Sequence, residues 1–161
     1  MKIRCARKEE LDEILRVYRA AKRYMDETGN PTQWEEGYPF PEMLCADIES
    51  GDLYVLADDT VHAVFYFALG EDETYKTIYE GAWKNDASYA VIHRVGSDGT
   101  ARGVMREIVA FCKERSSNIR IDTHENNQTM QHVLEKLGFD RCGIIYLPNG
   151  DPRIAYQLCV E

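Results

Sequence analysis

The segment that most constrains the fold lies at residues 89–104. It begins with the apolar run Tyr89-Ala-Val-Ile-His-Arg-Val95, passes through the turn Ser97-Asp-Gly99, and reaches Gly103 at the start of a helical pattern. A nearly all-apolar strand is expected at the centre of a sheet, with both faces covered. A strand, turn and helix joined in this way aim backbone N–H groups at open space, where the helix dipole adds positive potential. We therefore expect a central strand that leads to a place to hold a phosphate.

The rest of the chain alternates between helical and strand patterns. Apolar residues recur at helical spacing over 9–25, 100–115 and 130–137, and Pro41 starts a shorter helix that ends near Gly51. Asn126 or Asn127 can cap the third of these helices. Strands are expected at 3–6, 52–57, 61–69, 88–95, 118–122, 141–147 and 154–159. Helices fall between some strands while others meet as hairpins, so the sheet must be mixed. Residues 71–87 are polar and irregular, apart from a possible short helix at 75–79.

Bulk properties narrow the class of protein. The net charge of −9 argues against nucleic-acid binding, whereas it suits solubility or a cationic small molecule. No apolar run reaches membrane-spanning length, and the N-terminus does not read as a signal peptide. The five cysteines are scattered and form no Cys-x-x-Cys pair, which is typical of free thiols in a reducing compartment. We expect a single cytoplasmic domain over 1–161, without a metal and without a membrane or nucleic-acid partner.

Glycines before a helix have two interpretations, since they either cradle a phosphate or merely turn the chain. Neither Gly-x-Gly-x-x-Gly nor Gly-x4-Gly-Lys-Ser/Thr is present. The order of elements, however, resembles the GNAT superfamily of N-acetyltransferases over essentially the whole chain. Its Arg/Gln-x-x-Gly-x-Gly/Ala motif corresponds to Thr100-Ala101-Arg102-Gly103-Val104-Met105. Its second motif corresponds to Asn127 followed by Leu134-Glu-Lys136-Leu-Gly138-Phe139.

This resemblance implies an α/β (α+β) fold. We expect a GNAT-like mixed, mostly antiparallel seven-stranded sheet, with a splay between strands 4 and 5 and helices on both faces. It also implies that acetyl-CoA is the co-substrate. The amides of residues 100–105 would hold its pyrophosphate, while backbone groups of Arg94 and Val95 and the side chain of Asn127 would hold its pantetheine arm. Asn127 as a plain helix cap is compatible with that role.

Three positions depart from the family pattern. Thr100 replaces Arg or Gln and could cap the helix instead. Met105 replaces Gly or Ala and would place a side chain near the pyrophosphate. Leu134 stands where many relatives have a tyrosine that protonates the leaving thiolate.

Candidate catalytic residues follow from the need to make the amine neutral before it attacks. His93 on the central strand and His124 at the end of the fifth strand are candidate bases, because imidazole titrates in the useful range. Each could instead be structural, His93 in the core and His124 in a loop, with Asp122 and Glu125 as alternates. Tyr146, and similarly Tyr66, could protonate the thiolate. His62 and His132 fit exposed faces and receive no role.

Trp34 and Tyr38 lie in the segment that covers the acceptor side in this family, and with Tyr66 they could contact the substrate or anchor a long loop. We therefore expect transfer of an acetyl group from acetyl-CoA to a primary amine by direct attack in a ternary complex. The acceptor would be a small-molecule or peptide amine, and a homodimer is possible. A catalytically weak or inactive acyl-CoA-binding module is the alternative, favoured by Leu134, Thr100 and Met105.

Overall fold

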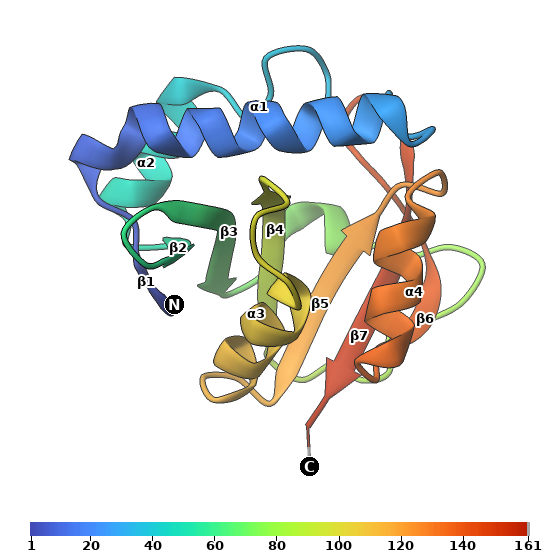
Figure 1. The fold of residues 1–161 in the computed structure, drawn as a ribbon. Coiled ribbons are helices and arrows are strands. Elements are labelled where there is room, and N and C mark those ends of the chain that lie inside the picture. Colours follow the sequence, from blue (N-terminus) through green and yellow to red (C-terminus); the bar gives the residue numbers. More distant parts are fainter. Residues whose placement is uncertain (161) are drawn as a thin grey trace.

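A seven-stranded sheet with helices on both faces forms the body of the molecule (Figure 1), and the computed structural model describes residues 1–160. The strand order is β1-β2-β3-β4-β5-β7-β6. Only the β4–β5 pair is parallel, so the predicted mixed, mostly antiparallel sheet is confirmed. The strands are β1 (Lys2–Cys5), β2 (Leu53–Ala57), β3 (Val61–Leu69), β4 (Ala90–Ser97), β5 (Asn118–Thr123), β6 (Asp140–Tyr146) and β7 (Pro152–Cys159).

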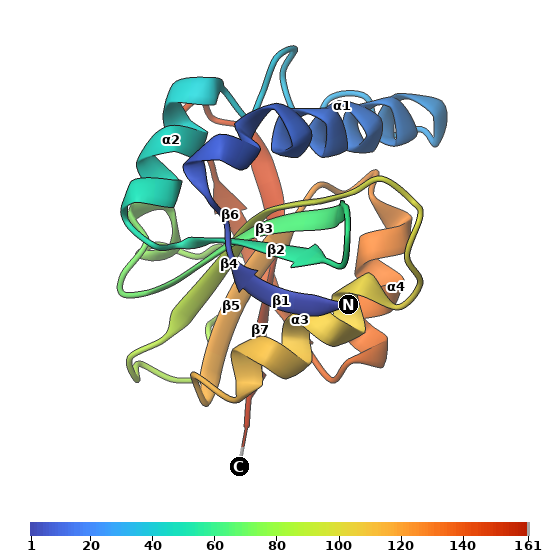
Figure 2. The ribbon, with the colours of Figure 1, turned by 60° about the vertical axis from the view of Figure 1, so that its left-hand side comes forward.

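Four α-helices cover the sheet in two pairs (Figures 1 and 2). Helices α1 (Leu11–Glu27) and α2 (Pro41–Glu49) lie on one face, and α3 (Val104–Lys113) and α4 (Gln128–Lys136) lie on the other. Single turns of 3₁₀ helix occur at Lys8–Glu10 and Glu73–Tyr75. The predicted order of strands and helices is confirmed. No helix within residues 1–160 is both long and apolar enough to cross a bilayer.

Each face of the sheet has its own core. On the α1 side the helix buries residues spaced three or four apart, including Ile14, Val17 and Ala21. On the other side Ile108 of α3 and Leu134 of α4 are fully buried against the sheet. The segment 70–89 covers the remainder of the α1 face and buries Tyr75, which is 1% exposed.

A buried polar network holds the end of this covering segment on the sheet. Asn118 of β5 and Gln157 of β7 are joined by a hydrogen bond of 2.6 Å, and both contact Asn85. The Arg120 guanidinium stacks on the rings of Trp83 and Tyr89, 4.1 and 3.9 Å from their centroids. Because the side chains of Asn85, Asn118 and Gln157 find partners, the irregular segment can lie against the sheet, and of this network only Arg120 Nε is buried without a hydrogen-bond partner among residues 1–160.

The sheet opens between β4 and β5, which confirms the predicted splay. The two strands pair only through Ala90 with Ile119 and Val91 with Arg120, and they then separate toward α1. Past this point β4 contains a bulge, where Arg94 adopts a positive φ of 51° and the register with β3 shifts. The Tyr18 hydroxyl of α1 donates to the Arg94 carbonyl at 2.8 Å, which holds the bulge in place.

Several local predictions were wrong. Helix α3 begins at Val104 and not near residue 100, because Gly103 precedes it in the left-handed conformation with φ 65°. Thr100 does not cap this helix, since its hydroxyl bonds Asp98 and the half-buried His62 ring. The Met105 side chain packs against the core, and its position beside the pyrophosphate stays a prediction. A 3₁₀ turn at 73–75 replaces the helix expected at 75–79.

Candidate active site

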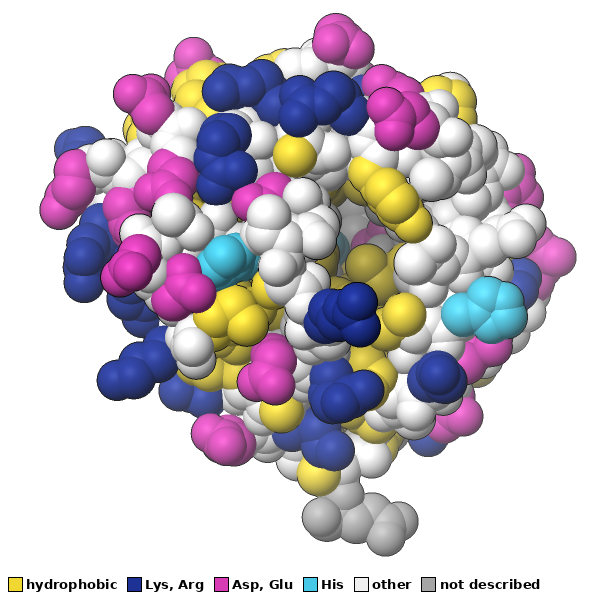
Figure 3. Space-filling model, in the orientation of Figure 1, with side chains coloured by type: hydrophobic (Ala, Val, Ile, Leu, Met, Phe, Trp, Pro, Cys, Tyr) yellow, Lys and Arg dark blue, Asp and Glu magenta, His cyan; other side chains and the backbone are white. Residues whose placement is uncertain are grey.

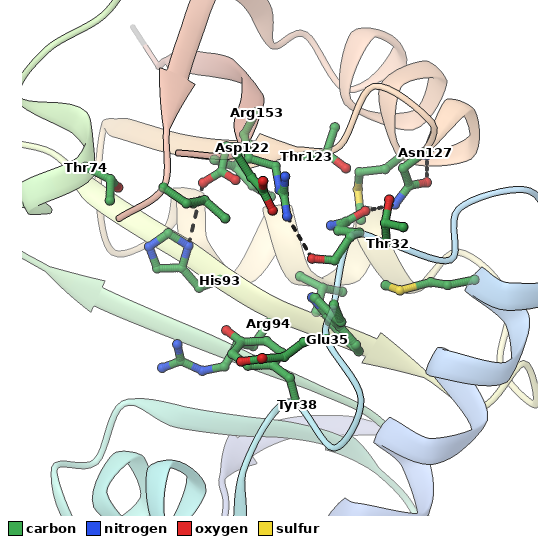
Figure 4. A pocket seen from close by; sticks show the side chains of 18 of the residues that line it. Thr32, Glu35, Tyr38, Thr74, His93, Arg94, Asp122, Thr123, Asn127 and Arg153 are labelled. Carbon is green, nitrogen blue, oxygen red and sulfur yellow. Dashed lines mark hydrogen bonds and ion pairs between the residues drawn. The ribbon is translucent and has the colours of Figure 1, made fainter. Parts of the chain in front are cut away.

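A cavity of about 870 Å³ opens where β4 and β5 separate (Figure 4), and Figure 3 shows the surface hollowed near the centre of this face. Its walls come from segments that are far apart in the sequence. They are the C-terminal part of α1, residues 31–38, the start of α2, residues 72–74, residues 92–95 of β4, residues 121–123 of β5, the start of α4, the β6–β7 turn and the start of β7. The separation of β4 and β5 therefore leaves a space large enough for a ligand.

His93 lies in this cavity (Figure 4), and an aspartate holds its ring in place. Its Nε2 is 2.6 Å from Asp72 Oδ2, while Thr74 donates to the other oxygen of the same carboxylate through its backbone and its hydroxyl. Burial alone would raise the pKa of Asp72, but the hydrogen bonds from His93 and Thr74 lower it to about 2. An ionised carboxylate only accepts hydrogen bonds, so the proton of neutral His93 resides on Nε2 and Nδ1 stays free.

The free Nδ1 atom of His93 faces a second carboxylate. It lies 3.9 Å from Asp122 Oδ2, which accepts a hydrogen bond of 2.6 Å from the Tyr75 hydroxyl. Burial and the nearby charge of Asp122 raise the pKa of Tyr75 well above its ordinary value, so this hydroxyl remains a donor. The His93 ring also stacks on Tyr66, with 5.9 Å between the ring centroids. His93 is therefore fixed in orientation, with one unoccupied acceptor nitrogen.

The bulge residue Arg94 sends its side chain away from the splay. Its guanidinium pairs with Asp47 at 2.7 Å and lies over the Tyr66 ring at 4.5 Å. Tyr66 thus supports both His93 and Arg94, and it lines a smaller pocket of about 230 Å³ next to the main cavity. Arg94 and Val95 do line the main cavity.

Asn127 and Thr123 lie at the α4 side of the opening (Figure 4). Asn127 caps α4 by accepting from the Met130 amide at 3.0 Å, and its side-chain nitrogen donates to Gln33 Oε1 at 3.1 Å. The Thr123 hydroxyl is buried, lines the cavity, and has no hydrogen-bond partner among residues 1–160. A buried hydroxyl without a partner is unfavourable, so this atom is suited to a ligand that enters the splay.

The N-terminus of α3, on the other face of the sheet from α1, is a second feature that bears on ligand binding. Gly103 makes no side-chain cap, and the first amides of a helix have no partner within the helix. A Cβ atom built on Gly103 would meet no atom within 4 Å, so the space in front of these amides is open. The geometry suits an anionic group.

The structure places the other predicted site residues in different surroundings. Trp34 and Tyr38 both line the cavity. Trp34 is nevertheless largely buried, only 8% exposed, because it packs against Tyr18 and Tyr38 in the aromatic cluster that anchors the loop. His124 is not among the residues that line the cavity, but its Nε2 lies 3.3 Å from the hydroxyl of Thr32, which does line it, and its Nδ1 accepts from the Asn126 amide. Burial, followed by the charge of Arg153, lowers the pKa of His124. Tyr146 is 44% exposed and packs edge-on against Tyr79.

Two residues of the cavity were missed from the sequence. Asp72 lies in the irregular segment 70–89, whose sequence carries no periodic signal. Arg153 follows a turn and reads as a solvent-exposed charge, yet it is only 4% exposed. Among residues 1–160, no group of three His, Cys, Asp or Glu side chains is arranged to hold a metal ion.

Comparison with known proteins gives consistent structural neighbours. A GNAT-family acetyltransferase from Streptococcus agalactiae 2603 shares 34% identity over 99% of this chain and 95% of its own, with a TM-score of 0.89. A proposed acetyltransferase from Staphylococcus aureus Mu50 shares 26% identity over the full length of both chains, with a TM-score of 0.70. A GNAT-family acetyltransferase from Listeria monocytogenes 4b F2365, at 17% identity over 99% of this chain and 94% of its own, shares the fold with a TM-score of 0.72. No family model and no curated protein sequence matches the chain.

Proposed function

The chain belongs to the GNAT family of acetyltransferases, and from this premise we propose that it transfers an acetyl group from acetyl-CoA to a primary amine by direct attack in a ternary complex. The observation that carries the proposal is the position of His93. It lies in the cavity at the splay, is oriented by Asp72, and keeps Nδ1 free to accept a proton.

The residues present fit acetyl-CoA at three places, and acetyl-CoA, when bound, would supply the acetyl group as a thioester. The uncapped amides of α3 would hold its phosphates, because they combine open space with the positive end of a helix. Backbone groups of Arg94 and Val95 and the side chain of Asn127 would hold its pantetheine arm. The unpaired Thr123 hydroxyl would gain a partner there.

His93 would act as the general base. An ammonium group entering between His93 and Asp122 would lie near two carboxylates, which favour its binding. Nδ1 would take a proton from it, and the hydrogen bond to the ionised Asp72 would stabilise the imidazolium that results. Such a base contributes roughly 10²- to 10⁴-fold in rate.

The leaving thiolate must be protonated, but this chain has no tyrosine at the position where many relatives have one. Leu134 there is fully buried in the core under α4 and carries no proton. The proton held by His93 is available inside the cavity, which makes the imidazolium our choice of donor. Tyr146 and Tyr66 remain predictions for this role, and His124 remains a prediction for the general base.

A direct experiment separates an enzyme from a binding module. The protein is incubated with acetyl-CoA and a panel of amines, and free coenzyme A thiol is followed. We expect thiol release that depends on both the amine and the protein. Calorimetric binding of acetyl-CoA without release by any amine would favour the module, and absence of binding would contradict both.

A further inference from the structure

A buried arginine forms part of the cavity without a carboxylate partner. Arg153 of β7 donates to two backbone carbonyls, those of Pro152 and Gln33, each at 2.8 Å. These acceptors are neutral, and a guanidinium carries five N–H donors. Within residues 1–160 no carboxylate oxygen lies within 4.0 Å of it, whereas the other two cationic side chains that line the cavity are paired, Lys22 with Asp26 and Arg94 with Asp47. Figure 4 shows the Arg153 guanidinium reaching into the cavity beside Asp122.

The strand register places Arg153 in one row with the proposed base. Val91 of β4 pairs with Arg120 of β5, so His93 and Asp122, each two residues further on, lie on the same face of the sheet. Asp122 pairs with Ala155 of β7, and Arg153 is two residues from Ala155 on that face. Diagonal neighbours of this kind have their Cα atoms about 7–8 Å apart. The row therefore runs from His93 on β4 through Asp122 on β5 to Arg153 on β7.

The charges along this row change sign. The His93 end carries Asp72 and Asp122, which suit an ammonium group. The Arg153 end offers a fork of donors, which suits a planar oxyanion such as a carboxylate. A polyamine would satisfy the first end and leave the buried guanidinium without a directly paired anion, with only the more distant charges of Asp122 and Asp151 acting on it.

From this arrangement, and resting on the proposed function, we infer that the acceptor is an amino acid or a similarly small zwitterion, whose amine lies at His93 and whose carboxylate is bound by Arg153. The carboxylate would therefore select the substrate and position its amine. Arg153 contacts the substrate away from the reacting atoms and is a specificity residue.

The test compares each L-amino acid of a panel with its own carboxamide and its decarboxylated amine. Two quantities are measured, the kcat/KM for coenzyme A release and the calorimetric Kd on protein saturated with coenzyme A. We expect at least one amino acid to be preferred over its carboxamide by 10- to 100-fold in both. In Arg153→Gln this preference, the ratio of the value for the acid to the value for its carboxamide, falls to about threefold or less. Arg153→Lys retains part of the preference, because it keeps the charge and loses the fork.

The outcomes separate the two proposals. Displacement of the loop at Gln33 would weaken the binding and turnover of acids and carboxamides alike. Loss of a carboxylate site would weaken the binding and turnover of the acids alone. If amines without a carboxylate release coenzyme A as fast as the acids, or if the preference survives in Arg153→Gln, the inference is wrong and the acetyltransferase function stands. If acids bind through Arg153 but no amine releases coenzyme A, the proposed reaction is wrong and the carboxylate site stands. If the acids neither bind nor react, the inference is wrong.

Discussion

At the scale of single residues, the proposed chemistry depends on how His93 is held. Replacement by glutamine keeps a polar side chain but removes the titratable nitrogen. We expect His93→Gln to lower kcat by about 10²- to 10³-fold with little change in the Kd of acetyl-CoA. Steady-state kinetics and calorimetry check this, with His132→Gln on the exposed face of α4 as the matched control. An unaltered kcat would remove His93 from the mechanism.

The aspartate beside His93 makes a separate prediction about stability. The pKa of Asp72 in the folded protein is about 2, lowered from 3.8, so its ionised form stabilises the fold at every pH above 3.8. That contribution decreases as the pH falls through 3.8 toward 2. The shift corresponds to about 2 kcal/mol at neutral pH. Asp72→Asn should therefore be about 1–2 kcal/mol less stable than the wild type at pH 7, with a smaller difference at pH 3.

Urea denaturation at the two pH values measures this difference. The control is Asp59→Asn, which removes an exposed carboxylate in the turn between β2 and β3. A deficit in Asp72→Asn that is equally large at pH 3 would mean that the charge of Asp72 is not what stabilises the fold.

The sequence predicted some site residues and missed others for a physical reason. His93 could be found because the apolar run around it predicts a central strand. Asp72 and Arg153 could not, because a polar residue in an irregular segment or beside a turn looks the same whether it is solvated or buried. Their burial is decided by the strand order and by how segment 70–89 crosses the sheet, and neither leaves a local pattern.

At the scale of elements, the N-terminus of α3 is where the turn and the helix are predicted to bind an anion. Gly103→Glu would place a carboxylate in the open space before the helix amides, and we expect the Kd of acetyl-CoA to rise at least tenfold by calorimetry. The left-handed φ of 65° would also strain any side chain there. Gly51→Glu, with φ 76° and equally open space, is the control for that strain. Unchanged affinity in Gly103→Glu would mean that the phosphates bind elsewhere.

A second glycine controls how α1 approaches β4. A Cβ atom on Gly96 would lie 2.8 Å from Cδ1 of Tyr18, the residue whose hydroxyl holds the Arg94 carbonyl. We expect Gly96→Ala to destabilise the protein by about 1–3 kcal/mol in chemical denaturation. The double variant Gly96→Ala with Tyr18→Leu should lose less than the sum of the single changes, because the ring that clashes is gone. Full additivity would contradict a direct contact.

The element pattern was largely predictable because it follows from apolar periodicity. The order of strands and helices and the cap at Asn127 were confirmed. The start of α3 was not, because Gly103 in the left-handed region delays it to Val104, four residues later than the helical spacing suggests. The bulge at Arg94 also has no local signal, since a non-glycine residue with positive φ is held there by Tyr18 from another element.

At the scale of the whole molecule, a ligand in the splay should stabilise the fold. Acetyl-CoA at 100 times its Kd is expected to increase the free energy of unfolding by about 2.7 kcal/mol. Thermal denaturation at increasing ligand concentration measures this, and Gly103→Glu should require a higher concentration for the same shift. Stabilisation that is identical in the two proteins would mean that the ligand does not use the α3 N-terminus.

The sparse pairing of β4 with β5 also divides the sheet mechanically. Two residue pairs join the block β1–β4 to the block β5–β7. The backbone amides that face the gap beyond Val91 therefore lack the interstrand hydrogen bonds that protect neighbouring amides from exchange with solvent. Deuterium should therefore enter these amides early, and a peptide-like molecule lodged in the gap should slow its entry by serving as a missing strand. The protein would then complete its own sheet only while its reactant is in place.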